Sequence, residues 1–144
     1  MTAPMRALAG FVAAAISVLV FHGGMWALLH AGGLMPPAWP TAPVGPLHVP
    51  LIADLCFWGG AYGAAFGLLL PRLPAAPLPL LGLGLGMAAI LVGWFVVAPL
   101  KGHPVGNGWG ASRVLLSLAL NLPWGVGVGL ILAAMRPRRA PLRA

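Results

Sequence analysis

Long apolar runs, separated by short breaks rich in proline and glycine, dominate the pattern of this chain. Four of the runs are long enough to cross a bilayer, which takes about 20 apolar residues in helical form. The first run continues past the length of a signal-peptide core, so we expect it to be an uncleaved helix. The predicted helices cover approximately residues 7–29, 50–70, 78–98 and 111–135. The pattern therefore predicts an all-α fold, a polytopic transmembrane bundle of four helices.

The breaks predict the connections. Residues 30–49 contain five prolines and three glycines, which indicates an extended, irregular loop. Trp39 within it is typical of a side chain at the membrane interface. Residues 71–77 contain three prolines and predict a tight reversal, and residues 99–110 form a second long loop. Pro123 lies inside the fourth run, where we expect it to free the carbonyl of Ala119 and bend the helix.

The composition predicts that lipid surrounds most of the protein surface. Hydrophobic residues make up 60% of the chain and charged residues only 6%, with a mean hydropathy of +0.98. A soluble domain carries about 25% charged residues, so the bilayer is the expected partner of most of the surface. Four helices and their loops use nearly all of residues 1–144 as a single transmembrane domain. No length remains for a soluble catalytic domain.

The basic residues indicate orientation. The net charge is +7, and four of the eight basic residues lie in the tail 136–144. A basic cluster directly after a hydrophobic span is a topology anchor that also meets anionic lipid, so we do not infer nucleic-acid binding. With both ends inside, six arginines lie on the cytoplasmic side and two basic residues, Lys101 and Arg113, on the outer side. This bias predicts an N-in, C-in protein of the inner (plasma) membrane. The Ala- and Gly-rich composition suggests a bacterial source.

Two features concern how the helices pack. Small residues recur at four-residue spacing, a pattern that lets helix backbones approach closely in lipid. Such rows fit packing within the bundle, or alternatively a homo-oligomer. Matches at an offset of 66 residues favour two repeated hairpins, although apolar sequence also produces such matches by chance. The packing candidates are Gly59, Gly63, Gly67, Gly125 and Gly129, and the matched pairs include Trp58-Gly59 with Trp124-Gly125 and Pro71-Arg72 with Pro137-Arg138.

Polar side chains within a membrane are costly and are therefore candidates for function. Five of them map to the outer half of the bundle: His22, Asp54, Arg113, Ser117 and Asn121. Arg113, Ser117 and Asn121 share one helix face through four-residue spacing. One interpretation is a structural cluster, in which Asp54, the only acidic residue, pairs with Arg113, Lys101 or a histidine. The other is a site for a small ligand or proton that opens outward.

Metal binding is a third interpretation of the outer half. All four histidines, His22, His30, His48 and His103, map there, but none forms a pair at close ligand spacing. The single cysteine, Cys56, excludes an internal disulfide. We therefore expect neither a metal nor a cofactor.

Three stretches resemble a class of short, uncharacterised bacterial inner-membrane proteins. They are residues 20–30 (with Val-Phe-His-Gly-Gly and Leu-Leu-His), residues 57–60 (Phe-Trp-Gly-Gly) and residues 98–105 (Ala-Pro-Leu-Lys-Gly-His-Pro-Val). The resemblance implies a four-helix membrane protein and no activity.

The function that these patterns favour is a non-enzymatic accessory or structural subunit, which associates with itself or with a larger membrane complex through small-residue helix faces. Enzymatic residue sets are missing from the sequence: there are no paired carboxylates and no nucleophile motif. One alternative is a small oligomeric transporter or channel with an outward-facing polar site. The other is a metal- or cofactor-binding membrane subunit.

Overall fold

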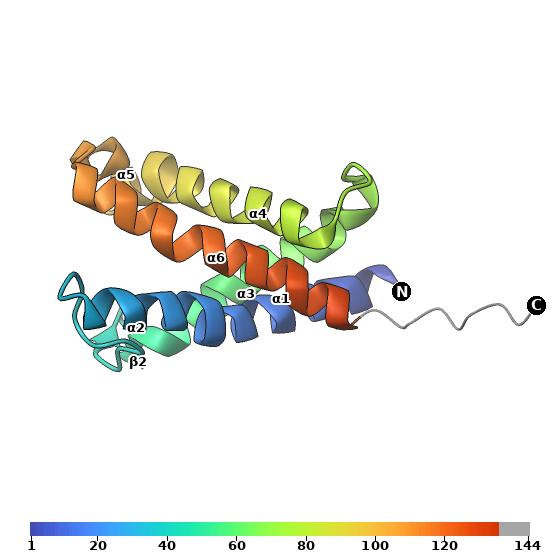
Figure 1. Cartoon of the computed structure of the whole chain (residues 1–144), viewed down its shortest axis with the longest axis horizontal. Coiled ribbons are helices and arrows are strands. Elements are labelled where there is room, and N and C mark those ends of the chain that lie inside the picture. The colour runs from blue at the N-terminus through green and yellow to red at the C-terminus, as the bar shows by residue number, and fades with distance from the viewer. Residues whose placement is uncertain (136–144) are drawn as a thin grey trace, which may run out of the picture.

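Four long helices make up the computed structural model, which describes residues 1–135 (Figure 1). The first combines α1 (Ala3–Ser17), the π-helical segment η1 (Val18–His22) and α2 (Gly23–Ala31). The second combines α3 (Leu51–Leu69) with the 3₁₀ turn η2 (Leu70–Arg72). The third combines α4 (Leu78–Val92), the π-helical segment η3 (Gly93–Val97) and α5 (Ala98–Leu100), and the fourth is α6 (Ala111–Met135).

All four helices are long and apolar enough to cross a membrane. The all-α prediction is confirmed, and the chain is a multi-pass membrane protein. The first helix begins at Ala3, earlier than expected, and α6 runs unbroken through Pro123. The basic tail and the repeat match at Pro137-Arg138 lie outside the described residues.

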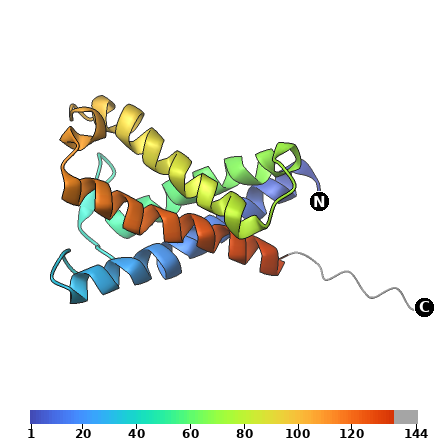
Figure 2. The ribbon, with the colours of Figure 1, turned by 45° about the horizontal axis from the view of Figure 1, so that its top comes forward.

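The helices form two antiparallel hairpins. The helix α1 packs along α3, α4 packs along α6, and α1 also packs against α6, whereas α3 and α4 barely touch. Figures 1 and 2 show both long connections at one end of the bundle, which we call the loop end. The N-terminus and the end of α6 lie at the opposite end, the terminal end. The hairpins are therefore joined mainly along one seam between α1 and α6.

Glycine lets the two helices of each hairpin touch backbone to backbone. In the first hairpin, a Cβ on Gly63 would collide with the carbonyl of Gly10. In the second, a Cβ on Gly125 would collide with the carbonyl of Gly82, and Gly129 lies against Leu78 in the same way. The predicted packing positions Gly63, Gly125 and Gly129 thus lie in contacts within the chain, as does Gly67, which meets the carbonyl of Arg6.

The two hairpins pack in the same way, but in a different register from the predicted one. Gly63 lies against Gly10 as Gly125 lies against Gly82, an offset of 62 residues for the second helices and 72 for the first. The sequence matches paired Gly59 with Gly125 at an offset of 66, which is one helical turn away. Gly59 instead faces Val18 and Trp124, at the contact between the hairpins.

Buried hydrogen bonds reinforce the seam between the hairpins. The Ser17 hydroxyl, fully buried, donates to the carbonyl of Trp124 at 2.6 Å. The indole N–H of Trp124 donates in return to the carbonyl of Ala14 at 3.1 Å. Because lipid supplies no competing water, each donor must find its partner inside the protein.

The loop between the first two helices folds back into the bundle. It contains a short antiparallel pair, β1 (Pro43–Val44) with β2 (Val49–Pro50), and the second long loop contains the 3₁₀ turn η4 (Val105–Gly108). The Trp39 indole N–H donates to the carbonyl of Leu19 at 3.0 Å, and its ring packs on Gly23. Trp39, expected at the membrane interface, is therefore also an anchor of the loop to the π-helical segment η1.

Candidate functional site

A cavity of about 160 Å³ lies in the loop-end half of the bundle, between the two hairpins. Its walls come from η1, α3, α4 and α6, so neither hairpin alone would form it. The lining residues that carry polar groups are His22, Trp58, Tyr62, Asn121 and Trp124; the apolar ones are Val18, Leu55, Gly59 and Ala89. The cavity is the clearest candidate for a functional site because it gathers polar groups inside a membrane span.

His22 ends the π-helical segment η1, which sets the direction of its ring. Single π-helical turns within α-helices occur frequently at functional sites. The imidazole makes an edge contact with Trp26, with ring centroids 5.8 Å apart. It lines the cavity and forms no hydrogen bond within the described residues.

Asn121 reaches the cavity from α6, on the opposite hairpin. Its amide nitrogen donates to the carbonyl of Ser117 at 2.9 Å, one turn earlier in the helix. Ser117 in turn donates to the carbonyl of Arg113 at 2.9 Å and receives the indole N–H of Trp94 at 3.4 Å. These bonds fix the Asn121 side chain and leave its carbonyl oxygen without a partner in the described part of the chain.

Two aromatic side chains add further hydrogen-bonding groups. Tyr62 lies edge-on to Trp124, with ring centroids 6.4 Å apart. Neither the Tyr62 hydroxyl nor the Trp58 indole N–H forms a hydrogen bond to any of residues 1–135. An unpaired polar group costs free energy in an apolar medium, so such groups favour a bound molecule or water.

Apolar side chains follow the polar lining of the cavity toward the terminal end. Buried Phe66, Leu85 and Val128 each lie four residues, one helical turn, beyond the lining residues Tyr62, Ala89 and Trp124. One turn is about 5.4 Å along a helix. The polar lining therefore ends here, and between α3 and α4 an apolar pocket of about 390 Å³, which shares Tyr62 with the cavity, continues toward the terminal end.

The structure separates the five polar residues that the sequence grouped together. His22 and Asn121 line one cavity, although no hydrogen bond joins them, and Ser117 supports Asn121 from the next turn. Arg113 is exposed and donates to the carbonyl of Asn107 in the loop at 2.6 Å. Asp54 does not line the cavity.

The expected ion pair of Asp54 is not formed. Among the described residues, its carboxylate pairs with neither Arg113 nor Lys101 nor a histidine. Asp54 lies in the first turn of α3, near the loop end. There the positive end of the helix dipole favours a carboxylate without any cationic side chain. Arg113 is instead bonded to the second long loop, where it donates to the carbonyl of Asn107.

The histidines do not converge. No group of three or more metal-binding side chains occurs among residues 1–135. His30 lies at the end of α2, where its Nδ1 is 2.8 Å from the carbonyl oxygen of Met35. Its contact is with the backbone of the loop.

Sequence reasoning missed the aromatic part of the site. Trp58, Tyr62 and Trp124 combine apolar rings with polar tips, and such residues suit the wall of an enclosed binding site. Their positions within apolar runs were visible in the sequence, but their directions depend on how the hairpins meet.

No family model, curated protein or solved structure matches this chain. The inference of function therefore depends on the cavity itself.

Proposed function

We propose that this chain is a small non-enzymatic transporter whose cavity takes up an uncharged, hydrogen-bonding molecule from the loop end. The observation that carries the proposal is a set of four polar groups that line one cavity and have no hydrogen-bond partner among residues 1–135. They are the His22 ring, the Tyr62 hydroxyl, the side-chain carbonyl of Asn121 and the indole N–H of Trp58, whose side chain is otherwise largely exposed. They supply both donors and acceptors, and aromatic rings flank them. A small planar molecule with an amide-like polar end fits this chemistry.

The absence of charge from the cavity wall selects an uncharged ligand. None of the lining residues is Asp, Arg or Lys. Transfer of an ion out of water is costly unless an opposite charge meets it. A neutral molecule pays a smaller desolvation cost and gains hydrogen bonds to the four side chains.

The arrangement of the hairpins supports transport. Transporters built from repeats place their binding site near the membrane midplane, at the contact between the repeats. Here the cavity lies between two similarly packed hairpins that meet mainly along α1 and α6. Rocking about this seam would widen the apolar pocket between α3 and α4 and open the cavity toward the terminal end. One chain lines the whole cavity, so binding does not require an oligomer.

The alternative of an accessory subunit depends in part on the small-residue faces. Gly63, Gly67, Gly125 and Gly129 pack against backbone of the same chain. These rows are therefore used within the bundle, and they no longer argue for a partner protein.

We place the terminal end in the cytoplasm of a bacterial cell, with the chain in the inner membrane. Arg6 and Arg72 lie at this end, α6 ends there and is followed in the sequence by the basic tail, and positively charged segments are retained inside. A green fluorescent protein fused after residue 144 should fluoresce in cells. A dark fusion that is expressed at full length would contradict this orientation.

Binding can be tested with benzamide, which is planar, uncharged and carries an amide. Trp58 and Trp124 line the cavity, so its occupation should change the intrinsic fluorescence of the purified protein. We expect saturable binding of benzamide. Benzoate and benzamidine, which carry a charged group on the same phenyl ring, should bind at least about tenfold more weakly. Equal affinities for the three probes would refute the proposal of an uncharged ligand.

Substitutions of cavity residues test where benzamide binds. His22→Leu and Asn121→Leu should each weaken benzamide binding by about two- to tenfold, the equivalent of one hydrogen bond. Ser112→Ala, a change in an exposed residue on the same helix as Asn121, is the matched control and should leave the affinity unchanged. Unchanged benzamide affinity in the double variant His22→Leu/Asn121→Leu would show that benzamide does not bind in this cavity. Benzamide flux in proteoliposomes then tests transport, since binding without flux would contradict the transporter while preserving the site.

A further inference from the structure

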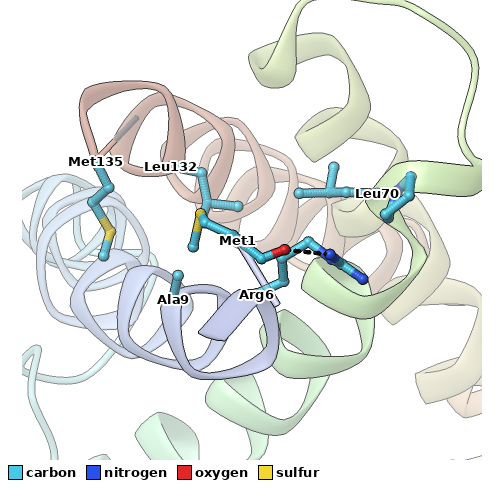
Figure 3. Close-up of a pocket in the computed structure, with 7 residues that line it drawn as sticks. Met1, Arg6, Ala9, Leu70, Leu132 and Met135 are labelled. Atoms are coloured by element: carbon cyan, nitrogen blue, oxygen red, sulfur yellow. Dashed lines mark hydrogen bonds between the residues drawn. The ribbon is translucent and has the colours of Figure 1, made fainter. Parts of the chain in front are cut away.

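A second pocket, of about 230 Å³, lies at the terminal end of the bundle (Figure 3). It opens between the first turns of α1, the end of the second helix and the last turns of α6. The lining residues are Met1, Arg6, Ala9, Leu70, Pro71, Leu132 and Met135. It shares no residue with the loop-end cavity, so it is a separate site.

Arg6 carries the single charged side chain in the wall of this pocket. Its Nη1 donates to the carbonyl of Met1 at 2.8 Å. Its Nε is buried and has no hydrogen-bond partner within the described residues. Figure 3 shows the side chain extending toward Leu70 with this one bond. A guanidinium offers five N–H donors in a fixed plane, so most of its capacity is unused.

No acidic side chain of this protein is in a position to neutralise Arg6. Asp54 is the only one in the chain, and it lies at the loop end of α3. It precedes Leu70 by 16 residues, a rise of about 24 Å along a helix. Arg6 also lies near the positive end of the α1 dipole, which has no acidic residue in its first turn. Both facts favour an external anion.

The remainder of the wall is apolar. Leu70, Leu132, Met135 and Ala9 contribute apolar side chains, and Figure 3 shows Leu70 nearest to the Arg6 guanidinium. A fully hydrated anion would gain nothing from these contacts. A molecule with a phosphate next to hydrocarbon would satisfy Arg6 and cover the leucines at once.

We propose that this pocket binds the headgroup of an anionic phospholipid, with the phosphodiester on Arg6 and an acyl chain along Leu70 and Leu132. Guanidinium and phosphate match in geometry, because two parallel N–H donors can meet two oxygens. Basic pockets between transmembrane helices bind anionic headgroups in the same manner. The bound lipid would tie α1, the end of the second helix and α6 together at the terminal end.

The test compares lipid adducts of the purified full chain by native mass spectrometry. Dioctanoyl phosphatidylglycerol and dioctanoyl phosphatidylcholine are the probes, and inorganic phosphate is added in a third arm. We expect the wild type to prefer phosphatidylglycerol and Arg6→Gln to lose about tenfold in that affinity, as expected for a charged hydrogen bond. Arg6→Lys keeps the charge without the planar fork, and it should recover only part of the preference.

Three controls separate this pocket from general surface charge. Arg72→Gln removes an exposed charge at the same end, Lys101→Gln removes one at the loop end, and both should bind within about twofold of wild type. Leu132→Trp fills the pocket without changing charge and should weaken phosphatidylglycerol binding. It also serves if Arg6→Gln does not fold.

Several results would overturn the proposal. One is phosphatidylglycerol binding by Arg6→Gln that equals wild type, and another is an equal loss in Arg72→Gln, which would indicate surface charge alone. Saturation by inorganic phosphate at the same concentration as the lipid would assign the site to free phosphate. Unchanged binding by Leu132→Trp would exclude the pocket.

Discussion

Adding one methyl group at a backbone contact within a hairpin should destabilise the bundle. The same change on a helix face without neighbours should stabilise it. On Gly125, a Cβ would lie 2.7 Å from the nitrogen and 2.9 Å from the Cα of Gly86, besides overlapping the carbonyl of Gly82. These are all backbone atoms of α4, so no side chain can move aside. Gly84, on the same helix α4, has nothing within 4 Å of its added Cβ.

The expected change in the free energy of unfolding has opposite signs at the two sites. Overpacking of a tight contact costs about 1–3 kcal/mol, which we expect for Gly125→Ala. Gly84→Ala meets no neighbour and removes the conformational freedom of glycine from a helix interior, a gain of about 0.5–1 kcal/mol. The difference in free energy of unfolding between the two variants is then about 1.5–4 kcal/mol.

Reversible unfolding in mixed micelles of dodecyl maltoside and dodecyl sulfate, followed by circular dichroism, measures this difference. Gly63→Ala, the equivalent change in the first hairpin, should resemble Gly125→Ala because its Cβ would meet the carbonyl of Gly10. If Gly125→Ala and Gly84→Ala shift the unfolding midpoint equally, the backbone contact between α4 and α6 is not as described.

Three further predictions concern polar contacts. Ser17→Ala should cost about 0.5–1.5 kcal/mol of stability in the same micelles, because it removes a buried hydrogen bond across the seam, while the carbonyl of Trp124 keeps its bond within α6; no change would contradict the described seam. Asp54→Asn and Arg113→Gln should show a coupling energy near zero in a double-mutant cycle, whereas a clear coupling energy would be evidence that the two side chains form an ion pair. Trp39→Phe should release the loop from η1, seen as faster hydrogen exchange at residues 19–23 with unchanged exchange in α6, and equal exchange in both proteins would refute the anchor.

The four helices could be predicted from the sequence because span length and apolar composition are local properties. The grouping of His22 with Asn121 also followed from their similar depth, since depth is fixed by position along a span. Both arguments need only the rise of a helix and the thickness of the bilayer.

Rotation and register could not be predicted, because nearly every face of these helices is apolar. Asp54 was expected to need a cation, but its position in the first turn of α3 supplies the positive dipole end instead. The repeat was aligned on tryptophan, yet Trp124 is buried in the seam while Trp58 is 57% exposed. The glycine contacts, which define the true register, carry no such conspicuous signal.

The pocket at Arg6 was also beyond sequence reasoning. Arg6 reads as an ordinary orientation signal at the start of a span. Only the return of η2 and the end of α6 to the same place turns it into the polar group of an apolar pocket.

Chemical labelling of the loop-end cavity tests the central claim most directly. In a Cys56→Ala background, Asn121→Cys places a thiol in the cavity, Leu130→Cys places one on the apolar exposed face of α6, and Ser112→Cys places one at the exposed loop end. A membrane-impermeant methanethiosulfonate reagent reacts with the thiolate, which forms only in contact with water. Added from the loop side of intact cells, it should label Asn121→Cys and Ser112→Cys but not Leu130→Cys, and benzamide should protect only Asn121→Cys. Full labelling of Ser112→Cys with none at Asn121→Cys would show that the cavity is closed to this side and contradict the account.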